Sequence, residues 1–138
     1  MRFFLDNNLS HRLTAPVAAL LPDHTCCCAR DEGLTAVDDV PLFAELRSRK
    51  FDAIITRDRR QLSNDEERSA LVESGLHWLG TKDTQVGGLK GISLDCASIT
   101  VGLAIVLPEL LSGRQHAFTF RALPHQRDQR VKPASLVR

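Results

Sequence analysis

The sequence predicts an α/β protein in which a mostly parallel sheet of about five strands lies between two layers of helices, a three-layer α/β/α sandwich. Short apolar runs alternate with segments whose apolar residues recur at helical spacing, in the order β-α-β-α-β-α-β-α-β. The run Ala53-Ile54-Ile55-Thr56 has a helical pattern on each side and suits a buried central strand. These two observations together favour parallel strands joined by helical crossovers.

Length and composition set the outer limits. A chain of 138 residues, 43% hydrophobic and 25% charged, has the size and composition of one globular domain. Its longest apolar segment, 99–111, is interrupted by polar residues and a proline, so no run reaches the roughly 18 residues of a bilayer crossing. The apolar opening of the chain meets Asp6 at once, which excludes a secretory signal. We therefore expect a cytoplasmic protein with no membrane partner.

The charge is unevenly distributed along the chain. Residues 121–138 carry five Lys or Arg and one Asp, although the net charge of the whole chain is only +1. This pattern predicts a domain over residues 1–123 and a basic C-terminal tail over 124–138. Such a tail suits either docking on a phosphate backbone or a solvated terminus.

The cysteines predict no special chemistry. Three are consecutive, Cys26 to Cys28, and the fourth is Cys96. This spacing matches neither a disulfide framework nor a paired zinc motif, so we expect small buried side chains without reactivity.

The expected elements follow from apolar spacing, capping residues, glycines and prolines. In order, they are a strand over 2–5, a helix over 9–21, a strand over 24–29, a polar turn over 30–33 and a helix that begins at Asp38 or Asp39. After the strand over 53–56 come a helix over 65–75, a strand over 76–79, an irregular segment over 81–93, a helix over 94–111 and a strand over 117–121.

Three carboxylates are the candidate catalytic and metal-binding residues. Asp6 and Asp58 each follow a predicted strand, and Asp39 begins a helix. Singly they suit an Asx turn, a polar strand end and an N-cap. If the first and third strands are neighbours, however, all three lie at one edge, where they repel one another unless a cation lies among them. Mg²⁺ or Mn²⁺ is the expected cofactor, because these hard cations bind oxygen ligands.

Asp38 competes with Asp39 for the inward position in this site. Asp39 is favoured because Leu42 and Leu46 then follow it at +3 and +7 on one helical face.

The neighbouring polar residues are candidates for substrate binding. Thr56 suits a hydrogen bond to a ligand carboxylate, and Asn7 and Asn8 follow the first strand. Three arginines lie beside Asp58 in the sequence: Arg57, Arg59 and Arg60. They could equally bind phosphate groups of a substrate or form salt bridges to the acids of the pocket itself. No G-x-S-x-G nucleophile motif is present, and a metal ion with an activated water can hydrolyse a phosphodiester without one.

The segments 2–10, 33–39 and 54–60 resemble those of PIN-like nucleases, and more closely VapC-type toxins of bacterial toxin–antitoxin pairs. The resemblance covers most of residues 1–80. It implies a PIN-like α/β/α sandwich and a Mg²⁺- or Mn²⁺-dependent ribonuclease for single-stranded RNA, with Asp6, Asp39 and Asp58 as metal ligands. It also implies a cognate antitoxin as partner and leaves a homodimer open.

The sequence departs from this family at one position. Many relatives have a further acid two residues after the strand-end aspartate, where this chain has Arg60. Weak substitutes for a fourth ligand are Asp38, Glu45 and Asp83.

Two alternatives stay open from the sequence. One is a catalytically weak module that binds RNA or a protein. The other is a phosphohydrolase that forms an aspartyl-phosphate. Such an enzyme needs a second aspartate two residues after Asp6, and the presence of Asn8 at that position counts against this alternative.

Overall fold

The computed structural model describes residues 1–137 and has one sheet of five parallel strands. The elements are β1 (Arg2–Leu5), η1 (His11–Leu13), α1 (Thr14–Leu20), β2 (Thr25–Cys28), α2 (Ala29–Glu32), α3 (Asp39–Ser48), β3 (Ala53–Thr56), α4 (Arg60–Ser63), α5 (Asp65–Ser74), β4 (His77–Thr81), α6 (Gly88–Leu110), β5 (Ala117–Phe120) and α7 (Arg127–Arg130). The predicted parallel α/β/α architecture is confirmed.

The strand order is β2-β1-β3-β4-β5, so β1 and β3 are neighbours, as the site hypothesis required. From β1 the chain moves to β2 on one side and then crosses back to β3 on the other. In parallel α/β sheets, ligands bind beyond the carboxyl ends of the strands at such a reversal. The topology therefore singles out the ends of β1 and β3.

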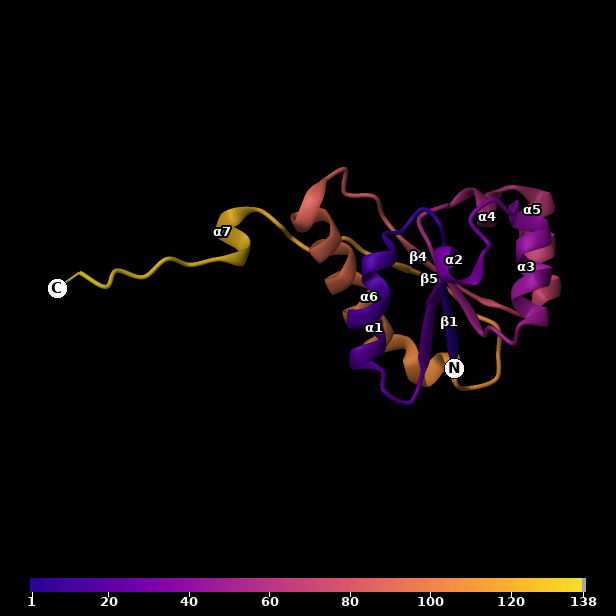
Figure 1. The fold of residues 1–138 in the computed structure, drawn as a ribbon. Helices are drawn as coiled ribbons and strands as arrows, with labels where there is room; N and C mark the ends of the chain where they lie inside the picture. Colours follow the sequence, from indigo (N-terminus) through magenta and orange to yellow (C-terminus); the bar gives the residue numbers. More distant parts are fainter. Residues whose placement is uncertain (138) are drawn as a thin grey trace.

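Helices cover both faces of the sheet (Figure 1). On one face, α1 and α6 pack against alternate strand residues such as Phe3, Leu5 and Ile55. On the other face, α3 and α5 pack against Phe4 and Ile54. The alternation along each strand separates two apolar cores, and this burial supplies the main favourable free energy of folding.

The last crossover differs in hand from the one before it. The chain moves in the same direction across the sheet from β3 to β4 and from β4 to β5, but α5 lies on one face and α6 on the other. Parallel crossovers on opposite faces have opposite hands, and about 98% of known ones are right-handed. The unit β4-α6-β5 is therefore built differently from the rest of the sheet.

Several element boundaries differ from those predicted. The helix predicted over 9–21 begins with the 3-10 turn η1, and Ser10 accepts a hydrogen bond from Arg12 as its cap. The polar turn over 30–33 is the short helix α2, which ends at Gly33 with φ of 70°. The irregular segment is shorter than expected, because β4 extends to Thr81 and α6 begins at Gly88. The short helices α4 and α7 were not predicted.

Helix α6 also corrects the expectation about apolar length. Within the described residues, this 23-residue helix is the one that is long and apolar enough to cross a membrane, and 28% of its most apolar window is buried. Length and composition alone are weak evidence, because core helices meet the same criterion. One face of α6 packs in the core through residues such as Ile99 and Leu103.

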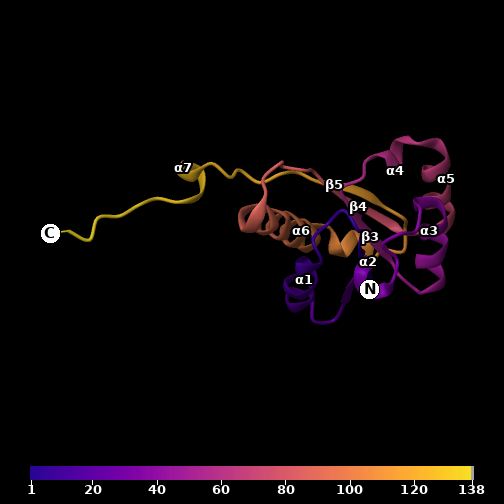
Figure 2. The same cartoon turned by 45° about the horizontal axis from the view of Figure 1, so that its top comes forward.

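The C-terminal segment leaves the body of the molecule. Leu123 is half-buried, whereas residues 126–137 are exposed, and both views show this segment leading away from the sheet (Figures 1 and 2). The division into a domain over 1–123 and a tail over 124–138 stays a prediction; residue 138 lies outside the described residues.

Candidate active site at the carboxyl edge of the sheet

Asp6 lies at the end of β1 and is buried, with 9% of its surface exposed. Its backbone N–H still donates to Ile55 of β3 at 2.9 Å, which anchors it at the sheet edge. One carboxylate oxygen accepts from the Asn7 N–H at 2.8 Å, and the other accepts from Thr56 Oγ1 at 2.8 Å and Gln61 Nε2 at 3.1 Å. All of these donors are neutral, so a buried negative charge is hydrogen-bonded without a counter-ion.

Asp39 reaches the same site from the first turn of α3. Its Oδ1 accepts from Gln61 Nε2 at 3.0 Å. Burial raises the pKa of Asp39 to about 6; the hydrogen bond from Gln61 acts in the opposite direction, and the charge of Asp6 raises it further. Asp38 is the N-cap residue and makes no side-chain capping hydrogen bond. Asp39 is therefore the one of the two that joins Asp6.

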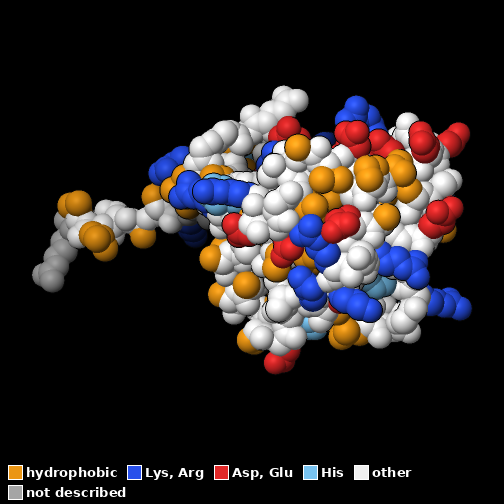
Figure 3. All heavy atoms as spheres, turned by 45° about the vertical axis from the view of Figure 1, so that its right-hand side comes forward, with side chains coloured by type: hydrophobic (Ala, Val, Ile, Leu, Met, Phe, Trp, Pro, Cys, Tyr) orange, Lys and Arg blue, Asp and Glu red, His pale blue; other side chains and the backbone are white. Residues whose placement is uncertain are grey.

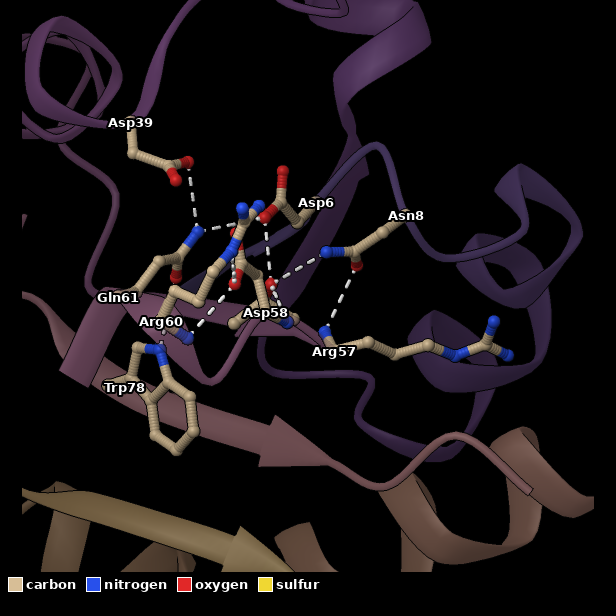
Figure 4. Close-up of polar contacts among 9 residues, drawn as sticks. Asp6, Asn8, Asp39, Arg57, Asp58, Arg60, Gln61 and Trp78 are labelled. Carbon is tan, nitrogen blue, oxygen red and sulfur yellow. Dashed lines mark hydrogen bonds and ion pairs between the residues drawn. The ribbon is translucent and has the colours of Figure 1, made fainter. Parts of the chain in front are cut away.

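Asp58 follows β3 at the same edge but is engaged differently (Figure 4). Its backbone N–H donates to Thr56 Oγ1 at 3.0 Å. Its Oδ1 accepts from the backbone N–H of Arg60 at 3.0 Å and from Arg60 Nε at 3.2 Å. Because the Arg60 side chain is 82% exposed, this ion pair is screened by water.

Thr56 and Asn8 join the ends of β1 and β3. Thr56 Oγ1 donates to Asp6 and accepts from Asn8 Nδ2 at 3.0 Å, while Asn8 Oδ1 accepts from the backbone N–H of Arg57 at 3.0 Å. Asn7 donates through its side chain to the Thr35 carbonyl at 3.3 Å. Thr56 therefore has the predicted contact with a site carboxylate, and Asn8 supports the loop that carries Asp58.

The three arginines do not form one cluster. The Arg57 side chain points away from the carboxylates (Figure 4). It pairs with Asp95 of α6. Arg60 pairs with Asp58, and exposed Arg59 has no ion-pair partner within residues 1–137. Basic and acidic side chains are interspersed over the face shown in Figure 3. The predicted salt bridge to an acid of the pocket itself is thus found for Arg60, whereas Arg57 pairs with an acid outside the pocket. The phosphate-binding role of all three stays a prediction.

Two site residues were missed by the sequence reasoning. Gln61 joins Asp6 to Asp39, and no motif marked it, because an amide in a short helix has no characteristic spacing. Glu67 of α5 raises the pKa of Asp39 through its charge, and its buried Oε2 has no hydrogen-bond partner among the described residues. Of the weak substitutes for a fourth acid, Glu45 pairs with Arg49 at 2.8 Å.

The cysteines make none of the hydrogen bonds of this site, although Cys28 lines a pocket together with Asp6 and Asn7. Burial raises the pKa of Cys26 to about 12, with further contributions from Cys27 and Cys28. All four cysteines are free thiols, and Cys26 and Cys28 are buried. The burial of Cys26 and Cys28 agrees with the prediction of small buried side chains, whereas Cys27 and Cys96 are half-buried. The absence of thiol chemistry stays a prediction.

The donor set suits a hard divalent cation in kind, since the carboxylates of Asp6 and Asp39 converge on one point. That point is taken by the amino group of Gln61, and Asp58 is turned to Arg60. As the side chains stand, no three His, Cys, Asp or Glu residues within 1–137 are grouped so that they could hold a metal ion. Asp6 and Asp39 are thus the pair best placed to hold Mg²⁺ or Mn²⁺, and the role of Asp58 as a third ligand stays a prediction.

The protein is a parallel α/β/α sandwich with acidic residues at the carboxyl ends of β1 and β3, where the strand order reverses. In domains of this class, ligands bind at this edge of the sheet. Residues 1–82 match the family described as PIN like domain, and the chain belongs to this family. PIN-like domains are generally nuclease folds, which suits the acidic edge. No curated protein matches the chain, and no solved structure does.

Proposed function

We propose that the protein is a Mg²⁺- or Mn²⁺-dependent endoribonuclease that cleaves single-stranded RNA. The observation that carries the proposal is the convergence of Asp6 and Asp39 at the edge where Asp58 also lies. These carboxylates come from β1, α3 and the end of β3, so the fold brings together acids that are distant in sequence.

In this proposal each residue has a separate task. Asp6, Asp39 and Asp58 hold the cation, Asp58 as the third ligand in place of its contact with Arg60. Thr56 fixes the orientation of Asp6 through its hydroxyl. A bound divalent cation would supply charge neutralisation at the phosphodiester and an activated water. Arg59, which is exposed and unpaired within residues 1–137, would bind an adjacent phosphate. No protein nucleophile is needed, which fits a site without a reactive thiol.

The test is cleavage of single-stranded RNA by the purified protein with Mn²⁺. We expect the protein to cut the RNA and the Asp58→Asn variant to cut much less. The control is the same reaction in EDTA. Equal cleavage by the protein and the variant would reject the role of Asp58, and no cleavage by the protein under any divalent cation would reject the nuclease.

We further propose that this nuclease is the toxin of a type II toxin–antitoxin pair of VapC type, acting in the cytoplasm. The support is the resemblance of residues 2–10 and 54–60 to those toxins together with the family match over 1–82. A small reading frame next to this one, whose product relieves growth arrest on co-expression, would support the pairing. Expression without growth arrest would argue against it.

A second candidate is a PIN-like module that binds RNA or a protein and cleaves weakly. The observation that favours it is the pairing of Asp58 with Arg60, which leaves two carboxylates free of a cationic partner. Calorimetry separates the candidates: RNA binding without measurable Mn²⁺ binding supports the module, whereas Mn²⁺ binding that Asp6→Asn abolishes supports the nuclease.

A further inference from the structure

Gln61 is fully buried and links three other elements of the fold. Its side chain projects from α4, with 0% of the residue exposed. Its Oε1 accepts a hydrogen bond from Trp78 Nε1 of β4 at 3.1 Å. Its Nε2 donates to Asp6 at 3.1 Å and to Asp39 at 3.0 Å (Figure 4). One carboxamide thus contacts both carboxylates of the proposed site and an indole beneath them.

The orientation of this amide follows from the chemistry of its partners. An indole N–H can only donate, so the oxygen of Gln61 must face Trp78. The two N–H groups then face the carboxylates, which can only accept when ionised. All three partners agree on one orientation, and a flipped amide would lose all three hydrogen bonds.

The packing of Trp78 makes that orientation rigid. Trp78 is 1% exposed and lies in the core between the sheet and α3 and α5. Its ring lies across Gly80, where a Cβ atom would overlap the indole. Gly80 is therefore needed for the indole to reach the place from which it holds Gln61.

The amino group of Gln61 stands where two carboxylates converge, and it carries the partial positive charge that this point attracts. A cation bound to both carboxylates would be repelled by the hydrogens of Gln61 Nε2, which carry partial positive charge. We propose that Gln61 is a positioning residue that holds Asp6 and Asp39 around its amino group and that a divalent cation must displace this group to bind. This inference depends on the proposed metal site, and it makes Trp78 a reporter of that site.

The decisive variant is Gln61→Glu, with Gln61→Met as the control of similar length. Glutamate keeps an oxygen for Trp78 and replaces the competing donor with a third carboxylate. Because affinity for a divalent cation rises with ligand charge, we expect Mn²⁺ to bind Gln61→Glu at least about tenfold more tightly than the unaltered protein. Gln61→Met removes the donor without adding a ligand, so its gain should be smaller.

Calorimetry with Mn²⁺ measures these affinities, and thermal unfolding with and without Mn²⁺ covers a variant that folds poorly. We expect Mn²⁺ to raise the melting temperature of Gln61→Glu by more than that of Gln61→Met or the unaltered protein. Affinity no higher than that of the unaltered protein, or failure of Mn²⁺ to restore an unfolded Gln61→Glu chain, would overturn the inference.

Trp78 supplies an independent readout, because it is the single Trp in a chain without Tyr. Titration with Mg²⁺, which is not paramagnetic, should change the Trp78 emission with the midpoint that calorimetry with Mg²⁺ gives, and Asp39→Asn should abolish the change. RNA cleavage by the unaltered protein without an emission change and without tighter binding by Gln61→Glu would overturn this inference alone. Tighter binding by Gln61→Glu without RNA cleavage would overturn the nuclease and leave the inference standing.

Discussion

Two buried carboxylates, Asp6 and Asp95, are treated differently by the fold. Asp95 of α6 is 3% exposed and is paired with the guanidinium of Arg57. Asp6 at the end of β1 is 9% exposed and accepts hydrogen bonds only from neutral groups. Burial raises the pKa of Asp95, while the charge of Arg57 acts in the opposite direction.

The proposed function gives these two buried carboxylates different roles. A buried ion pair is electrically complete, and it ties the loop after β3 to α6. The Asp6 carboxylate has neutral donors and no cationic partner, and the Asp39 carboxylate accepts from the same Gln61 nitrogen. The Asp6–Asp39 pair should therefore govern metal binding and cleavage, and the Arg57–Asp95 pair should govern stability.

The largest expected effect is on catalysis. Asp6→Asn and Asp39→Asn remove ligand charge from the site, and we expect each to lower RNA cleavage by about 100-fold or more. Steady-state cleavage with saturating Mn²⁺ measures this. Near-normal cleavage by Asp6→Asn would show that the Asp6–Asp39 pair does not govern cleavage.

Cation binding should also stabilise the folded protein. A ligand present at 100 times its Kd stabilises by about 2.7 kcal/mol. We therefore expect Mn²⁺ to raise the melting temperature and EDTA to reverse the rise. The gain should vanish in Asp6→Asn and persist in Asp95→Asn. A gain that survives in Asp6→Asn would place the cation elsewhere.

Breaking the structural pair should cost stability. Asp95→Asn leaves Arg57 without its counter-ion, and we expect a loss of about 2 kcal/mol in the free energy of unfolding, because the guanidinium is partly exposed. Urea denaturation measures the loss, and Mn²⁺ affinity of the folded variant should stay close to that of the unaltered protein. Loss of Mn²⁺ affinity in Asp95→Asn would show that the Arg57–Asp95 pair belongs to the metal site and is not a separate structural pair.

A further expected effect is on the pH dependence of stability without divalent cations. The pKa of Asp39 rises from 3.8 to about 6 on folding, so the folded state binds more protons than the unfolded state between these values. Stability from this group is therefore greatest at low pH and declines as the pH rises from about 4 to about 6. Urea denaturation in EDTA across this range should show a steeper decline for the unaltered protein than for Asp39→Asn.

The sequence carried most of the fold because the architecture depends on local patterns. Alternating apolar runs and helical spacing mark the five strands and the main helices, and Gly33 and Gly75 end their helices in the left-handed region, as the φ angles of 70° and 72° show. Boundaries were less predictable. Helix α6 begins at Gly88, inside a glycine-rich segment whose local propensity disfavours a helix.

The sequence by itself predicted that Asp6, Asp39 and Asp58 would reach one edge if β1 and β3 were neighbours, because parallel strands end on the same side. The tertiary structure supplied that condition by pairing β1 with β3. Only the tertiary structure decided which partner each charge would have. Arg57 pairs with Asp95 of α6, which lies 38 residues later in the sequence. Gln61 accepts a hydrogen bond from Trp78, which lies 17 residues later. Such pairings depend on distances between separately packed elements, and no local pattern in the chain encodes them.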